Sequence, residues 1–311
     1  MLELYAGVAV NGLLIGVIYA LVATGLNVIF GVMRVVNFAH GEMVVVGMYL
    51  GYSLWQFTGL SPLASLPITV ALTFAFGYGF QLAIGNDFVS RPQHVQFVLY
   101  IGLGLAITGL HAMIFGPDPR AIQGEAGFDV YRIGFLRIDA VRLHAAAVAL
   151  GVIAALSAWL RWSMTGKALH AASENLVGGQ AIGLRIDRIF ALTMGIGVAC
   201  AGTAGALLAQ LYDTQPYLAS EFTMIAFIIV IIGGLASLPG ALLLSQFLPV
   251  GVTLLLLVGG LYLAFEGAEK VIEKLGGETH GETLDGPISD PVQFERARVK
   301  GAVRTDFILS A

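Results

Sequence analysis

Long apolar runs separated by short polar stretches organise most of this chain. A bilayer core about 30 Å thick needs roughly 20 apolar residues in a helix to cross it, and several runs approach or exceed that length. The predicted membrane-spanning helices are 4–31, 62–86, 95–116, 141–160, 189–211, 222–236 and 240–263. The first run is far longer than the apolar part of a signal peptide and no basic segment precedes it, so we expect a first span rather than a cleavable signal.

One apolar run is too short to cross alone. The stretch "RVVNFAHGEM" at 34–43 leads into "MVVVGMYLGYSLW", whose 13 residues reach only about 20 Å as a helix. Either this segment is re-entrant, or its helix begins near Val35 and carries Asn37, His40 and Glu42 into the membrane. Both interpretations place polar side chains at or below the lipid surface.

A second short run has the same character. "FTMIAFIIVII" is followed by "GGLASLPG", a glycine and proline break. Two short, interrupted apolar segments, one near each end of the apolar body, indicate a transport site, although plain loops produce the same spacing.

Asn37, His40 and Glu42 are therefore the candidate residues of a substrate pathway. An ionisable residue within a span indicates function only if it lies deep in the membrane. The alternative is a helix that starts at the cytoplasmic surface, with Asn37 as its N-cap, Glu42 soon after the first turn, and Gly41 allowing close packing.

Composition supports a membrane protein and excludes several other classes. Hydrophobic residues make up 57% of the chain and charged residues 12%, where a soluble domain has about a quarter charged. Of the 36 charged residues, 15 fall in the last 46 positions, which predicts a polar tail after an apolar body. The net charge of −4 and the absence of a basic block argue against nucleic acid as a partner.

No motif for catalysis, metal binding or nucleotide binding is evident. The scattered histidines do not form a zinc motif, and the single cysteine, Cys200, lies among small apolar residues that suggest packing. "TGKAL" at 165–169 lacks the upstream glycine and the serine or threonine of a P-loop. We therefore expect no enzyme activity and no cofactor in this chain, and ATP that drives transport would be used by a partner subunit.

The stretch 161–188 is the longest polar connection in the apolar body. Its helix-forming pieces are interrupted by Gly178, Gly179 and Gly183, which predicts two short amphipathic helices with a turn. It is either a plain connector or a docking segment for a cytoplasmic partner. If the segment after Val35 crosses, the side that holds 161–188 carries six basic loop residues against four, which mildly favours the cytoplasm for that side and the outside for the N-terminus.

Four long stretches carry a resemblance to a known family. These are "GLNVIFGVMRVVNFAHGEMVVVGMYLGY", "GLAITGLHAMIFGPDPRAI", "GKALHAASENLVGGQAIGLRIDRIFAL" and "PYLASEFTMIAFIIVIIGGLASLPGALL". Over about 5–243 the chain resembles the H-type (LivH-like) permease subunits of branched-chain amino acid ABC importers. The resemblance implies a pathway formed with a second, related permease, two cytoplasmic ATPase subunits and a periplasmic substrate-binding protein, in the bacterial inner membrane.

The resemblance also gives the stretch 161–188 a role. It looks like the coupling segment of the family, which makes Glu174, Asn175 and Gly183 candidates for contact with an ATPase subunit. It does not fix the solute, because similar permeases import branched-chain amino acids, amides, urea or aromatic acids.

The C-terminal part resembles a different group. "GGLYLAFEGAEKV" and "KGAVRTDFILSA" are similar to an internal fragment of an uncharacterised bacterial inner-membrane family. We therefore predict a chimera, a gene fusion or an assembly error, with the join between Ala241 and Pro249. The predicted division is 1–243 for the permease-like domain, 244–265 for a last hydrophobic segment, and 266–311 for a polar tail that is partly helical or disordered.

The chain is thus predicted to be an all-α polytopic transmembrane bundle of about eight hydrophobic segments, some broken or re-entrant, with a polar C-terminal tail. The expected function is that of the membrane-spanning permease of an ATP-driven importer for branched-chain amino acids or related small polar solutes. Two alternatives remain: an ion-coupled secondary carrier, which needs paired ionisable residues deep in spans, and a non-transporting chimeric or structural membrane protein.

Overall fold

The computed structural model describes residues 2–122, 130–133 and 136–233, all of which belong to one compact unit, Met1–Phe247. A second unit, Leu248–Ala311, lies outside the described residues. The predicted span 240–263 and the predicted tail 266–311 therefore also lie outside them.

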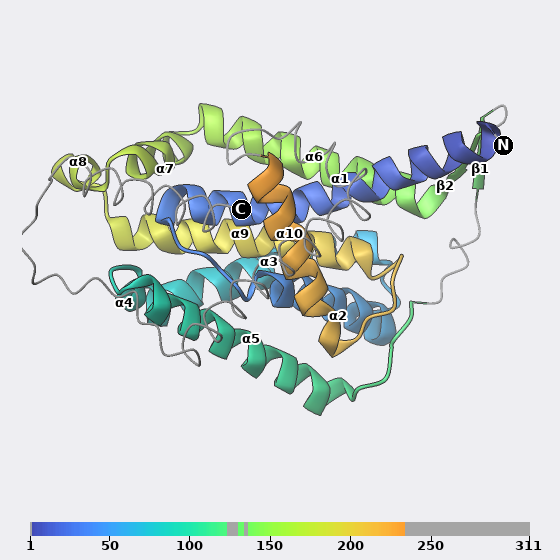
Figure 1. Cartoon of the computed structure of the whole chain (residues 1–311), viewed down its shortest axis with the longest axis horizontal. Helices are drawn as coiled ribbons and strands as arrows, with labels where there is room; N and C mark the ends of the chain where they lie inside the picture. Colours follow the sequence, from blue (N-terminus) through green and yellow to red (C-terminus); the bar gives the residue numbers. More distant parts are fainter. Residues whose placement is uncertain (1, 123–129, 134–135, 234–311) are drawn as a thin grey trace, which may run out of the picture. The chain divides into compact units, whose positions relative to one another are not determined.

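Helices make up nearly all of the described chain (Figure 1). The α-helices are α1 (Leu2–Met33), α2 (His40–Thr58), α3 (Pro62–Phe80), α4 (Asn86–Val89), α5 (Gln93–Phe115), α6 (Ala140–Trp162), α7 (Met164–Glu174), α8 (Leu176–Ala181), α9 (Ile186–Leu208) and α10 (Ala219–Gly233). A π-helical turn, Gln81–Gly85, joins α3 to α4, and a 3₁₀ turn, Pro216–Leu218, precedes α10. A two-stranded antiparallel sheet, β1 (Val130–Ile133) and β2 (Leu136–Asp139), pairs Val130 with Asp139.

Five segments of the described chain are long and apolar enough to cross a membrane. They are Ala6–Met33, Pro62–Val89, Gln93–Phe115, Ala140–Trp162 and Ile186–Leu208. They correspond to five of the predicted spans, and Pro216–Ile231 is a shorter apolar helix, as expected for the interrupted segment there. The prediction of a polytopic helical membrane protein is confirmed.

Capping residues fix where several of these helices begin. Ser61 precedes Pro62, and its hydroxyl accepts a hydrogen bond from the Ala64 amide at 3.3 Å. Asp139 caps α6 in the same way, with its carboxylate accepting from the Arg142 amide at 3.1 Å. These side chains satisfy amides that the first turn of a helix leaves without partners.

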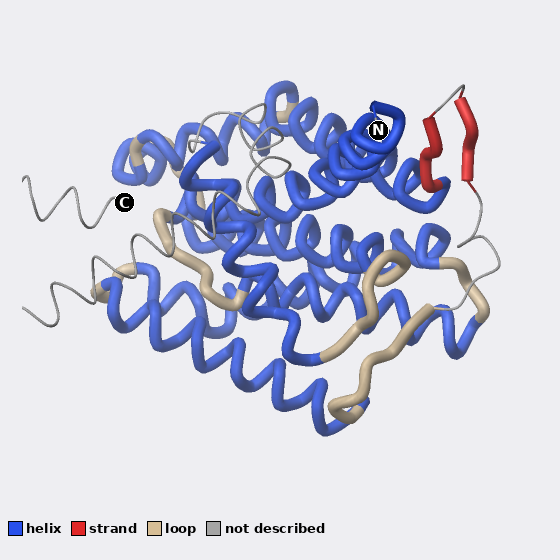
Figure 2. The backbone as a smooth tube through the Cα atoms, turned by 45° about the vertical axis from the view of Figure 1, so that its right-hand side comes forward, coloured by secondary structure: helices blue, strands red, loops and turns tan. Residues whose placement is uncertain are grey.

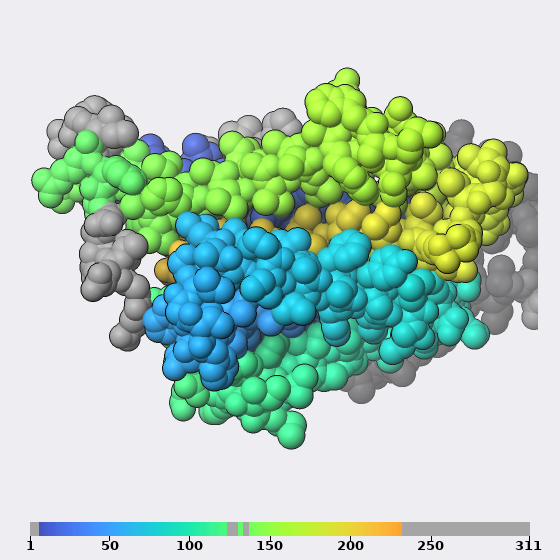
Figure 3. Space-filling model, turned by 180° about the vertical axis from the view of Figure 1, so that it is seen from behind, coloured from blue at the N-terminus to red at the C-terminus, as the bar shows by residue number. Residues whose placement is uncertain are grey.

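Helix α9 lies at the centre of the bundle and packs against α1, α2 and α3. Seen from behind, it lies between α3 and α6 and is partly covered by them (Figure 3). Small residues allow the close approach, because a Cβ at Gly25 of α1 would come within 2.5 Å of the Gly197 carbonyl oxygen. Gly47 of α2 is packed in the same manner against Gly202.

The two ends of the bundle gather different connections. At one end, the Asn86 side chain donates to the Asp187 carbonyl at 3.2 Å, close to α7 and α8. At the other end the β-hairpin lies beside the start of α1 (Figure 2), where Asn11 donates to the Arg137 carbonyl at 3.1 Å. We call these the α7 end and the hairpin end.

Candidate functional site

The segment between α1 and α2 is not helical, and it enters the interior of the bundle. Helix α1 ends at Met33, and the next residue, Arg34, is exposed and adopts a left-handed φ of 56°. The next residues turn inward, and Val35, Asn37 and Ala39 are each at most 1% exposed. Non-helical backbone is tolerated at membrane depth only where protein or a cavity surrounds it.

Helix α2 begins halfway through the bundle. The imidazole of His40 reaches the Val22 carbonyl oxygen, near the middle of the α1 span. On the other side of α2, the carboxylate of Glu42 lies against Gly104, the middle residue of α5, where an added Cβ would come within 2.8 Å of it. The helix therefore starts at His40, not near Val35, and the chain that precedes it is not helical.

Helix α10 also begins at this depth, beside the start of α2. The Gly41 amide donates to the Thr223 hydroxyl at 3.0 Å, and that hydroxyl donates to the Ala219 carbonyl at 3.0 Å. The rings of Phe38 and Phe227 lie 5.2 Å apart, just beyond this junction. In Figure 1, α10 crosses its neighbours at a steep angle. The two short segments singled out in the sequence thus meet inside the bundle.

His40 is fully buried and has one free acceptor. Its Nε2 atom lies 2.9 Å from the Val22 carbonyl oxygen. Because a carbonyl oxygen only accepts, Nε2 carries the proton in the neutral ring and Nδ1 is left as an acceptor. Nδ1 is buried and has no hydrogen-bond partner among the described residues.

Glu42 occupies the third position of α2 and is half-buried. A carboxylate in the first turn is stabilised by the positive end of the helix dipole. Its Oε2 atom is nonetheless buried without a partner in the described part of the chain. The start of α2 therefore presents two buried acceptors without donors in the described chain, Glu42 Oε2 and His40 Nδ1.

Asn37 is not the N-cap of α2, and this part of the capping interpretation is wrong. The N-cap is Ala39, which has no side chain able to cap. Asn37 instead accepts from the Ala39 amide at 3.0 Å, a bond to the second residue ahead that supports the turn before the helix. Its amide nitrogen lies 3.9 Å from the Met194 sulfur, which is a weak contact.

His40 and Glu42 do not pair with each other. His40 faces α1 at Val22, whereas Glu42 faces α5 at Gly104. The secondary-carrier alternative needs a coupled ionisable pair at depth, and this geometry does not supply one. No group of three potential metal ligands occurs among the described residues either.

The stretch 161–188 forms two short helices, α7 and α8, as predicted. The break falls at Asn175, whose side chain accepts from the Gly178 amide at 2.8 Å and caps α8. Gly178 and Gly179 lie inside α8, so the expectation that they interrupt the helix is wrong. Gly183, with φ of 88°, closes α8 through the bonds that the Gly183 and Leu184 amides donate to Gln180 and Gly179.

The coupling candidates therefore differ in what they can do. Asn175 and Gly183 shape the segment, because one begins α8 and the other ends it. Glu174 is exposed and lies 3.3 Å from His170, another exposed side chain. Val177 and Ile182 are each 75% exposed, although they are apolar. These two exposed residues were not singled out in the sequence, since nothing there distinguishes them from core residues.

These features define a class: a polytopic helical membrane protein in which two short helices begin inside the bundle, as in many transporters. The chain belongs to the family described as branched-chain amino acid transport system / permease component, whose model matches residues 8–268. It is accordingly a multi-pass inner-membrane protein and a permease component of an importer. A second family model, described as a protein of unknown function (DUF808), matches residues 226–311.

Relatives from several organisms support the first assignment. The chain is 26% identical to the high-affinity branched-chain amino acid transport system permease protein LivH of Salmonella typhimurium, over 75% of this chain and 80% of that protein. It is 27% identical to BraD of Pseudomonas aeruginosa over the same shares. A probable LivH of Methanocaldococcus jannaschii is 25% identical over 72% of each chain. No solved structure matches. Both resemblances seen in the sequence are confirmed, and the position of the join stays a prediction.

Proposed function

We propose that this chain forms a substrate pathway with a second, related permease, and that the start of α2 lies on that pathway. The observation that carries the proposal is the depth of Asn37, His40 and Glu42, which lie near the middle of the long helices. A buried, interrupted helix supplies polar groups that replace the water a solute loses on entry.

The proposed solute is a branched-chain amino acid or a related small polar molecule. The family description and the names of the relatives point to that class. The site adds a chemical reason, because Glu42 Oε2 and His40 Nδ1 both lack a hydrogen-bond donor in the described chain. An α-ammonium group matches either acceptor, although the two face different sides of α2, and the apolar side chain of such a solute suits the neighbouring rings of Phe38, Phe97 and Phe227.

Energy for transport would come from two ATPase subunits at the α7 end, which we place in the cytoplasm. A periplasmic substrate-binding protein would deliver the solute from the opposite side of the membrane. The exposed apolar surface of Val177 and Ile182, beside the charged Glu174, supports α8 as the docking element. In this scheme the chain performs no covalent catalysis and holds no cofactor, and ATP is bound and hydrolysed by its partners.

Reconstitution tests the pathway proposal. The chain is placed in proteoliposomes with the ATPase, binding-protein and second permease subunits of its importer, and uptake of labelled leucine is measured with and without ATP. Glu42→Gln, Asn37→Leu and His40→Leu should lower ATP-dependent uptake while the complex still assembles. Wild-type uptake by all three variants would show that these residues only start a helix.

A separate measurement tests coupling. Val177→Asp and Glu174→Lys should reduce the amount of ATPase subunit that co-purifies with the chain. The matched control is Asp213→Lys, which changes an exposed acidic residue of the hairpin end by the same charge. Equal recovery of the ATPase subunit with all three variants would remove α8 as the docking element.

A further inference from the structure

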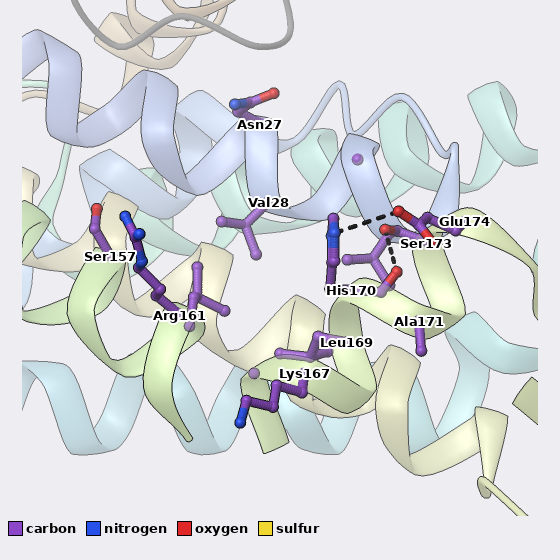
Figure 4. A pocket seen from close by; sticks show the side chains of 14 residues that line it. Asn27, Val28, Ser157, Arg161, Lys167, Leu169, His170, Ala171, Ser173 and Glu174 are labelled. Atoms are coloured by element: carbon purple, nitrogen blue, oxygen red, sulfur yellow. Dashed lines mark hydrogen bonds and ion pairs between the residues drawn. The ribbon is translucent and has the colours of Figure 1, made fainter. Parts of the chain in front are cut away.

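A cavity of about 710 Å³ opens at the α7 end, between the last turns of α1, the end of α6, and α7 (Figure 4). Its polar lining includes Asn27 of α1, Ser157 and Arg161 of α6, and Lys167 and His170 of α7. Its remaining walls include aliphatic side chains, so the cavity combines a charged portion with an apolar portion.

The cavity holds positive charge that the described chain does not neutralise. Its one acidic residue, Glu174, lies 3.3 Å from His170. Within the described ranges, no carboxylate comes within 4.0 Å of Arg161 or Lys167. In Figure 4, Arg161 and His170 flank the space beneath Asn27, whereas Lys167 points away from it. Arg161 is therefore the cation best placed to meet an anion inside the cavity.

Aromatic residues indicate the depth of this cavity in the membrane. Trp159 and Trp162, in the last turn of α6 beside Arg161, are 38% and 74% exposed. Tryptophan is enriched where lipid headgroups meet water, because its ring is apolar and its N–H is polar. The cavity therefore opens at the level of the headgroups rather than in the hydrocarbon.

We propose that this cavity binds an anionic phospholipid, with the headgroup phosphate against the Arg161 guanidinium. The guanidinium presents paired N–H donors that match phosphate oxygens. Asn27 and Ser157 supply further donors, and Val28, Val32 and Leu160 supply the apolar wall that a glycerol backbone and acyl chain require. A free phosphate ion has no apolar part to pack against that wall, so the apolar wall favours a lipid. This site is separate from the pathway at the start of α2 and does not depend on it.

Two variants disrupt the cavity in different ways. Arg161→Gln removes the cation and keeps the volume. Gly31→Leu fills the space and keeps every charge, since an added Cβ at Gly31 meets no atom within 4 Å. The matched controls are Arg137→Gln, which removes a cation at the hairpin end, and Gly7→Leu, where an added Cβ of the same helix also meets nothing within 4 Å.

Native mass spectrometry of the purified full-length chain measures the binding. Dioleoylphosphatidylglycerol is titrated into delipidated protein, with dioleoylphosphatidylcholine and sodium phosphate as separate arms. We expect one tightly held phosphatidylglycerol, with apparent affinity about tenfold lower in Arg161→Gln, as for a lost hydrogen bond to a charged group. Gly31→Leu should lose that lipid, and both controls should retain it.

Several results would overturn the proposal. Equal retention of phosphatidylglycerol by all four variants, or an equal loss in the controls, would remove the cavity as its site. Equal binding of phosphatidylcholine, which has the same phosphate but no net charge, would show that the site does not select an anionic lipid. Displacement of the lipid by millimolar sodium phosphate would assign the site to a soluble anion. Because binding is measured without transport, none of these outcomes depends on whether leucine uptake succeeds.

Discussion

The junction of α2 and α10 makes Gly41→Ala the most direct test of the site geometry. An added Cβ at Gly41 would lie within 2.6 Å of the Thr223 backbone nitrogen, and closer still to the Ala219 carbonyl oxygen and the Thr223 hydroxyl. Real Cβ atoms do not approach this closely. Two of the three neighbours are backbone atoms in the first turn of α10, so they can yield only if α10 itself moves.

The size of the effect follows from two opposing terms. Extra volume in a packed interior typically costs about 1–3 kcal/mol. Replacing glycine by alanine in a helix recovers roughly 0.5–1 kcal/mol of conformational free energy. At Gly41 the packing cost should exceed the recovery. At Gly51, on the same helix, an added Cβ would meet Ala206 at 3.4 Å, an ordinary contact, so Gly51→Ala should be neutral or slightly stabilising.

The assay compares these two variants in the reconstituted importer. We expect Gly41→Ala to lower both the thermal stability of the chain and ATP-dependent leucine uptake, and Gly51→Ala to preserve both. If Gly41→Ala melts and transports as the wild type does, α2 and α10 do not need to meet closely. If both variants fail equally, the defect belongs to α2 in general and the argument from this junction is refuted.

Three further changes test neighbouring features. Thr223→Val removes the acceptor of the Gly41 amide, so it should lower the free energy of unfolding by about 1–3 kcal/mol and also lower uptake. Thr223→Ser keeps the hydroxyl and should retain both. Thr193→Val loses only a bond within α9 and should leave uptake intact. His40→Leu should lower thermal stability by breaking the bond to the Val22 carbonyl. Gly183→Ala should strain the left-handed turn by roughly 1–2 kcal/mol. The expected result is that less ATPase subunit co-purifies with the chain. Unchanged recovery of the ATPase subunit would show that this turn is dispensable.

The spans could be predicted from the sequence because each depends on a local property. A run of apolar residues long enough to cross a bilayer is visible without any knowledge of its neighbours. The span predicted at 141–160 is observed as Ala140–Trp162, and the span predicted at 62–86 is observed as Pro62–Val89. The remaining differences lie at the ends, where caps such as Asp139 fix the first residue.

The depth of α2 could not be predicted, because it depends on which helices surround it. The sequence showed a run that was too short, but both a surface start and a buried start agreed with that length. The deciding contacts join positions far apart in the chain, such as Glu42 with Gly104 and Gly41 with Thr223. The presence of two interrupted segments in the sequence was the one indication of the contact between Gly41 and Thr223. Nothing in the sequence singled out Gly104.

The same contacts bear on the proposed role of these polar groups in transport. Two backbone amides here have side-chain partners: Asn37 accepts from the Ala39 amide, and Thr223 of α10 accepts from the Gly41 amide. The close packing of α10 on Gly41 also limits the room for water at the junction. His40 Nδ1 and Glu42 Oε2 remain as buried acceptors without donors in the described chain, and an unfilled buried acceptor costs roughly 1–3 kcal/mol. An ammonium group that reaches either of these acceptors would relieve its cost only while the solute passes the start of α2, which is the property a transient binding site requires.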